Sequence, residues 1–235
     1  MRPNPIPLIT ICLLVSLFSL AQDADRYNLL LKTGIITPEK NTTSEKLNQF
    51  NRSAVRTNEK AFAIIQFEEL PTDAEKQQLK QAGIELLDYI PNNAYTVTIT
   101  GSLNEEILLQ TKARAVVELS PSQKMHTSIS SGLFPAWAVK VQGTVDVWVS
   151  FPKSFSYETV KKELLAKNID VISDLYKEYN ILSLRIAAQR LFELASFPFI
   201  EYVQPAPGED KPLNAWTNWN RDGMKATLLN APLSV

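Results

Sequence analysis

An order of elements that occurs twice constrains the fold of this chain more than any other feature. Runs that favour strands and helices follow one another as strand, helix, strand, strand, helix, strand, and the same succession returns roughly 85 residues later. The offset varies only where turns differ in length. The residues that correspond are Phe67 with Phe151, Ile84 with Ile169, Ile99 with Ile186, and Pro121 with Pro205. The sequence therefore predicts an internal duplication.

The first copy has recognisable helix ends. Thr72 followed by Glu75 is a capping box, and Gly83 is typical of the residue that ends a helix. Ser102 followed by Glu105 predicts a second capped helix. The expected strands are 61–67, 84–90, 94–99 and 115–119, and the second helix is expected to end at Gln110.

The second copy repeats this order. Val160, Leu164 and Leu165 lie on one face of a predicted helix. Asn168 takes the helix-ending place that Gly83 holds in the first copy. The expected strands are 144–151, 169–175, 181–186 and 199–203, and the expected helices are 156–167 and 188–196.

The rules of chain connection favour one topology for such a unit. Strand–helix–strand crossovers are nearly always right-handed, and two interleaved crossovers give a four-stranded antiparallel sheet with both helices on one face. We therefore predict an α+β fold of two tandem ferredoxin-like βαββαβ units. Each copy has about 60 residues, which is near the lower limit for a domain that folds alone.

The N-terminus is typical of a signal peptide. An apolar run from Leu8 to Leu20 is short for a membrane-spanning helix, and small residues at Ser19 and Ala21 fit a cleavage site after Ala21. The alternative is an uncleaved anchor. We expect a secreted, periplasmic or extracellular protein that is not held in a membrane after cleavage. The predicted organisation is a signal peptide at 1–21, a polar, loosely attached leader at 22–60, domains at 61–122 and 142–206, a linker at 123–141, and an extended tail at 207–235. The leader has one apolar patch, residues 29–31 and 35–36, and the alternative is that this patch adds a strand.

The side chains that catalysis needs are scarce. The single histidine, His126, lies in the polar linker, and the only cysteine, Cys12, lies in the predicted signal peptide. A catalytic triad or a zinc site is therefore not expected. The carboxylate pairs Glu68-Glu69 and Glu105-Glu106 are expected to face water. We predict no catalytic, cofactor-binding or metal-binding residue, and the net charge of −1 argues against nucleic acid as a partner.

The sheet faces turned away from the helices are the candidate binding surfaces. Alternation along the strands places Ala63, Ile65, Phe67, Val147, Val149 and Phe151 toward the helices. The opposite faces then carry six predicted partner-binding residues: Phe62, Ile64, Thr96, Thr98, Trp148 and Arg185. Phe62, Ile64 and Trp148 are too apolar for faces that meet only water. Alternatively, the two copies or the leader cover each other's faces.

Several segments together point to a known family. They are Ala61–Phe67 with the helix 72–83, the strand-closing segments 117–121 and 201–205, the leader segment 29–34, and the tail segment 218–228. This arrangement resembles the inhibitor-type propeptides of secreted bacterial subtilisin-like serine proteases. The protease's Asp, His and Ser motifs are missing, the chain stops at Val235 where a catalytic domain would follow, and two copies depart from the simplest propeptides.

The resemblance implies a non-catalytic folding assistant and inhibitor of a subtilisin-like protease domain, acting in cis or in trans. In that family the sheet face packs on the enzyme and the tail lies in the substrate cleft. Two other hypotheses stay open: a free-standing exported protein-interaction or surface-assembly module, and a hydrolase with an unrecognised carboxylate site. A reading frame beyond Val235 that encodes the protease motifs would favour the propeptide.

Overall fold

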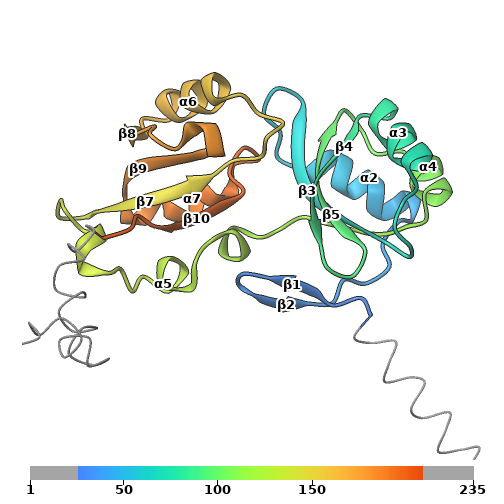
Figure 1. Ribbon diagram of the computed structural model, residues 1–235, viewed down its shortest axis with the longest axis horizontal. Helices are drawn as coiled ribbons and strands as arrows, with labels where there is room; N and C mark the ends of the chain where they lie inside the picture. The colour runs from blue at the N-terminus through green and yellow to red at the C-terminus, as the bar shows by residue number, and fades with distance from the viewer. Residues whose placement is uncertain (1–25, 209–235) are drawn as a thin grey trace, which may run out of the picture.

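The computed structural model describes residues 26–208, which form an α+β structure of two four-stranded antiparallel sheets and one two-stranded hairpin. Figure 1 shows the two sheets side by side, each with its own helices, joined by the segment that carries α5 (Thr127–Ser130). The predicted signal peptide and most of the predicted tail lie outside the described residues.

The first sheet has the strand order β4-β5-β3-β6. Its elements are β3 (Lys60–Phe67), α3 (Asp73–Gln81), β4 (Ile84–Ile90), β5 (Ala94–Thr100), α4 (Glu105–Gln110) and β6 (Ala113–Val117). The first three predicted strands are confirmed to within one residue. The fourth starts earlier than predicted because Lys112, in the left-handed region at φ 55°, turns the chain directly after α4.

The second sheet has the strand order β10-β7-β9-β8. Its elements are β7 (Thr144–Ser150), α6 (Tyr157–Ala166), β8 (Asp170–Ser173), the 3-10 turns η3 (Lys177–Tyr179) and η4 (Ala188–Arg190), β9 (Ile181–Ala187), α7 (Leu191–Ser196) and β10 (Tyr202–Pro205). In both sheets the first and third strands of the unit lie in the middle and the second and fourth form the edges.

The last strand of the second sheet starts three residues later than the predicted 199–203. Phe199 and Ile200 are buried in a turn, in which the Ile200 amide donates to the Phe197 carbonyl at 3.1 Å. An apolar run that is buried without strand pairing has the same composition as a strand, which explains the error.

The helix ends agree with the sequence at three of four places. Thr72 and Glu75 form the capping box that begins α3. Gly83 and Asn168 follow α3 and α6 in the left-handed region, with φ of 83° and 53°. The Ser102 capping box was wrong: the N-cap of α4 is Asn104, whose side chain accepts from the Glu106 amide at 2.8 Å.

Each sheet has a core between one of its faces and its own helices. In the first unit, Ala63, Ile65 and Phe67 pack with Leu79 of α3 and Leu108 of α4. In the second unit, the cluster joins the sheet to both helices through Val147, Val149, Phe151, Val160, Leu164, Leu191 and Leu194. The predicted helix-facing residues of the strands are therefore confirmed. Leu165, which was expected on the same face of α6 as Val160 and Leu164, is exposed instead.

The leader is not loosely attached. Residues 29–36 form a hairpin of β1 (Leu29–Leu31) and β2 (Gly34–Ile36), and α2 (Ser44–Ser53) follows. The hairpin lies on the sheet face opposite the helices, where Leu29 packs with Ile64 and Ala94. Leu47 of α2 joins the core on the helix side. The polar composition misled the prediction because two short apolar segments are sufficient to anchor this leader on both faces.

The leader also covers one edge of the first sheet. Asn41 donates through its side chain to the Val116 carbonyl of β6 and accepts from the Val116 amide, both at 2.8 Å. Its own amide donates to the Arg114 carbonyl at 3.2 Å. These bonds satisfy backbone groups of β6 that an edge strand would otherwise leave free.

The predicted linker is folded onto the second unit. It contains η1 (Pro121–Lys124), α5 and η2 (Ala136–Ala138), and its residues Met125 and Ile129 are buried in the second core. The amide of His126 donates to the Val203 carbonyl at 2.8 Å, along the outer edge of β10. The His126 side chain is exposed and caps α5 by accepting from the Ser128 amide. Within residues 26–208, no helix has the length and hydropathy needed to cross a membrane.

Candidate binding surfaces

Four of the six predicted partner-binding residues are buried inside the chain. Phe62 and Ile64 lie on the outer face of the first sheet, and the hairpin packs against Ile64. Gln66 on the same face is also buried and donates to the Tyr27 carbonyl of the leader at 3.1 Å. A partner could reach this face only if the leader moved away.

Thr96 and Thr98, the other two buried residues, are engaged within the chain. The hydroxyl of Thr96 accepts from the Asp88 amide at 3.0 Å. The hydroxyl of Thr98 bonds the Ser154 hydroxyl of the second unit at 2.5 Å. The face is therefore covered by the leader and by the other unit, which is the alternative that the sequence left open.

Further polar contacts join the two units. The Lys60 ammonium donates to the Ser154 carbonyl at 2.7 Å, and the Lys153 ammonium donates to the Leu87 carbonyl at 3.3 Å. The hairpin turn takes part as well, because the Thr33 hydroxyl donates to the Gln123 carbonyl of η1 at 3.2 Å. Leader, linker and both units therefore meet in one region.

Lys124 of η1 is the most deeply buried cation in this region, with 5% of its surface exposed. Its ammonium donates to the Phe197 carbonyl at 3.0 Å and lies 5.6 Å from the centre of the Phe62 ring. Burial lowers the pKa of Lys124 to about 8, although the carboxylates of Glu118 and Glu201 act in the opposite direction.

Trp148 and Arg185 lie together on the outer face of the second sheet, where both are half-buried. The Trp148 ring contacts that of Tyr176, with centres 5.1 Å apart. Arg185 donates two hydrogen bonds to the buried Asp146 carboxylate, at 2.7 and 2.9 Å. Since Arg185 already bonds Asp146, the pair of Trp148 and Tyr176 is the part of this face that a partner could contact more readily.

The segment 172–179, which contains Tyr176, carries further exposed apolar side chains. Tyr176 is 41% exposed and Leu175, next to it, is 75% exposed. Ile172 of β8 and Tyr179 of η3 are also exposed. Neighbouring apolar groups of this size on a surface are typical of a contact site.

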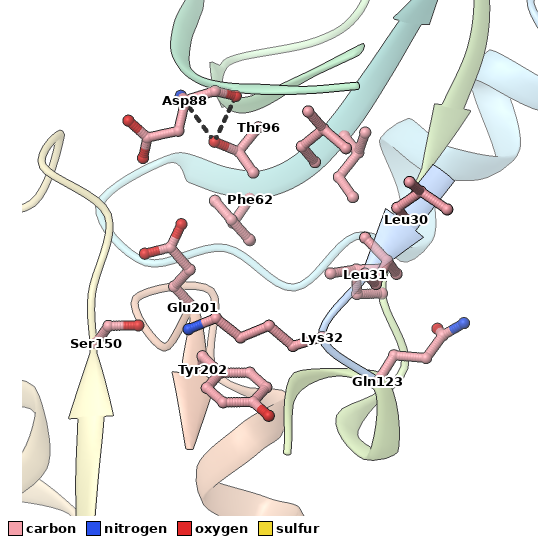
Figure 2. A pocket seen from close by; sticks show the side chains of 13 residues that line it. Leu30, Leu31, Lys32, Phe62, Asp88, Thr96, Gln123, Ser150, Glu201 and Tyr202 are labelled. Atoms are coloured by element: carbon pink, nitrogen blue, oxygen red, sulfur yellow. Dashed lines mark hydrogen bonds between the residues drawn. The ribbon is translucent and has the colours of Figure 1, made fainter. Parts of the chain in front are cut away.

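A cavity of about 400 Å³ lies where the hairpin, the first sheet and the second unit meet. In Figure 2 the hairpin residues Leu30, Leu31 and Lys32 approach it from one side, Asp88 and Thr96 of the first sheet from another, and Glu201 and Tyr202 from a third. Its complete lining is Leu30, Leu31, Lys32, Phe62, Ile64, Asp88, Ile90, Thr96, Leu119, Gln123, Ser150, Glu201 and Tyr202.

Glu201 and Asp88 bring carboxylates into this partly apolar cavity. Burial raises the pKa of Glu201, and the nearby Asp88 raises it further, whereas Lys32, Ser150 and Lys124 lower it. Lys32 lies with its ammonium 4.6 Å from the centre of the Tyr202 ring. Sequence reasoning missed this site because its walls come from segments far apart in the chain. The one available signal was the apolar patch in the leader.

The predicted carboxylate pairs are spread over the surface. Glu68 forms an ion pair with Lys40 at 2.9 Å, and Glu69 forms one with Lys112 at 2.5 Å. Glu105 accepts from the Ser44 hydroxyl of α2. Among the described residues, no cluster of three His, Cys, Asp or Glu side chains is arranged to hold a metal ion.

Comparison with known proteins finds a match to a family model in the first half of the chain. Residues 30–120 match the model of a family described as a domain of unknown function, DUF8729. The matched segment contains most of the hairpin, α2 and the whole first sheet, so it includes part of the leader as well as the first unit. No curated protein and no solved structure matches the chain.

Proposed function

We propose that this chain is a non-catalytic, exported binding module of two ferredoxin-like units, which assists the folding of a subtilisin-like serine protease domain and inhibits it. The partner domain is joined in cis or binds in trans. The equal strand order of the two sheets supports the duplicated unit, since a split βαβ arrangement has its first and third strands in the centre.

The observation that carries the binding proposal is the difference between the two outer sheet faces. The first face is covered by the hairpin and the second unit, whereas the second presents Trp148 and Tyr176 among exposed apolar neighbours. Aromatic side chains of this kind are enriched at the centres of protein interfaces. The second unit is therefore the one that contacts the partner.

The exit of the chain from the second sheet supports a tethered inhibitor. β10 ends at Pro205, and the Ala206 amide donates to the Asp146 carbonyl at 3.0 Å, which fixes where the following residues start. A domain joined after this point would meet its inhibitor at an effective concentration on the order of millimolar. An extended segment can also add main-chain hydrogen bonds in a protease cleft.

The direct test is inhibition of a purified subtilisin-like catalytic domain by the chain without residues 1–21. A domain encoded in frame after residue 235 is the first choice of enzyme. We expect slowed hydrolysis of a chromogenic peptide, and Trp148→Ser is expected to weaken inhibition about tenfold or more, because a central interface tryptophan carries about 2 kcal/mol.

Phe192→Ser is the matched control, since Phe192 is an exposed aromatic residue of α7 on the helix side of the same unit. It should leave inhibition unchanged. A folded Trp148→Ser variant that inhibits like the wild type would remove the second sheet face from the proposal. Failure of the wild type to inhibit any such enzyme would leave the free-standing interaction module as the better account.

A further inference from the structure

The cavity between the units has the size and lining of a small-molecule site. Its volume of about 400 Å³ lies within the range of pockets that hold small ligands, about 300 to 1,000 Å³. Six apolar side chains contribute to its walls: Leu30, Leu31, Phe62, Ile64, Ile90 and Leu119. Such walls favour the apolar body of a ligand, and the polar groups among them decide which head group fits.

The cavity lining carries two carboxylates, Asp88 and Glu201, and one ammonium group, Lys32. Lys32 is positioned over the Tyr202 ring, and Lys124 is bonded to the Phe197 carbonyl. The closest ion pair of Asp88 is the one with Lys153, at 3.4 Å. Among the described residues, Glu201 has no ion pair within 4.0 Å, although it is half-buried. Its side chain bonds Ser150, and Lys32 and Lys124 lower its pKa from a greater distance. A carboxylate that is partly out of water is stabilised further when a cation comes close to it.

We propose that this cavity binds a small organic amine, with the ammonium group against the Glu201 carboxylate and the apolar body against Phe62, Ile64 and Leu31. The site joins the hairpin to both units, so a bound amine also strengthens their contact. This inference does not depend on the inhibitor function proposed above.

The probe is phenethylamine, and 2-phenylethanol is its neutral counterpart of the same shape. Isothermal titration of the chain without residues 1–21 at pH 7 should give at least about tenfold tighter binding of the amine, which corresponds to about 1.4 kcal/mol. Amide shifts in the NMR spectrum are expected at Leu31, Phe62 and Glu201. In Glu201→Gln, the two probes should bind with equal affinity.

Two further variants test whether the preference for the amine comes from Glu201 and whether the probes bind in the cavity. Glu193→Gln removes a carboxylate of α7 that bonds Arg190 and does not line the cavity, so it should keep the preference for the amine. Ile90→Trp fills the cavity and should abolish binding of both probes while the melting curve shows a folded protein. The proposal would be overturned if the wild type bound both probes with equal affinity, or if Glu201→Gln still preferred the amine. Amide shifts confined to another surface would overturn it as well.

Discussion

Lys124 shows at the scale of one residue how the two units are joined. A lysine in a segment that reads as linker is normally solvated, and neither composition nor pattern distinguishes this one. It is buried because Phe62 of the first unit and Phe197 of the second close around it. Burial disfavours the charged form of this side chain, and its pKa is therefore lowered.

The lowered pKa of Lys124 predicts a dependence of stability on pH. The folded protein releases this proton near pH 8, whereas the unfolded chain holds it to about 10.4. The unfolded state therefore binds more protons between these values, and the free energy of unfolding should rise with pH in that window through Lys124. In Lys124→Met, which has no charge, this contribution is absent.

Urea unfolding of the wild type and Lys124→Met at pH 7, 8, 9 and 10 measures this contribution of Lys124 to the free energy of unfolding. The difference in unfolding free energy should shift in favour of the wild type as the pH rises. Lys46→Met serves as the control, because Lys46 of α2 is exposed and its variant should track the wild type at each pH. A Lys124→Met difference that stays constant from pH 7 to 10 would show that the lysine is solvated.

At the scale of elements, residues with a local role were predicted well. Thr72 begins a helix, and Gly83 and Asn168 follow helix ends, through bonds and backbone angles that depend on their immediate neighbours. Ser102 failed because Asn104, two residues later, offers a competing cap. The helix α2 was missed, and the hairpin was anticipated only as one added strand. The stability of both comes from residues more than thirty positions away, such as Ile64 and Leu108.

The hairpin supplies a prediction with a neighbouring control. Leu29 is 0% exposed under the first sheet, whereas Leu30 beside it is 54% exposed. Leu29→Ala should lower the free energy of unfolding by about 2 to 5 kcal/mol, since it leaves a cavity in a packed site. Leu30→Ala should cost much less. Urea unfolding, followed by circular dichroism, gives the free energy of unfolding of both variants. Small and equal losses in the two would show that the leader is loosely attached.

At the scale of the whole molecule, two sheets of corresponding strand order were predictable, and what covers their outer faces was not. The alternation in β3 and β7 fixes which residues face the helices, because that pattern is local. What covers the other faces depends on how the copies and the leader assemble. Ile64 and Trp148 hold corresponding positions in the two copies, yet Ile64 is buried under the hairpin and Trp148 lies half-buried on an open face. The cavity around Glu201 arises from the same assembly.

The account depends most on the first outer face being sealed and the second being open. Hydroxyl-radical footprinting of the chain without residues 1–21, read by mass spectrometry and normalised to each side chain's intrinsic reactivity, measures both faces in one sample. We predict rapid labelling of Trp148 and Tyr176 and strong protection of Phe62. The claim that the first face is covered and the second is open would be contradicted by either of two results. One is labelling of Phe62 as fast as that of Trp148, and the other is protection of Trp148 in the free chain.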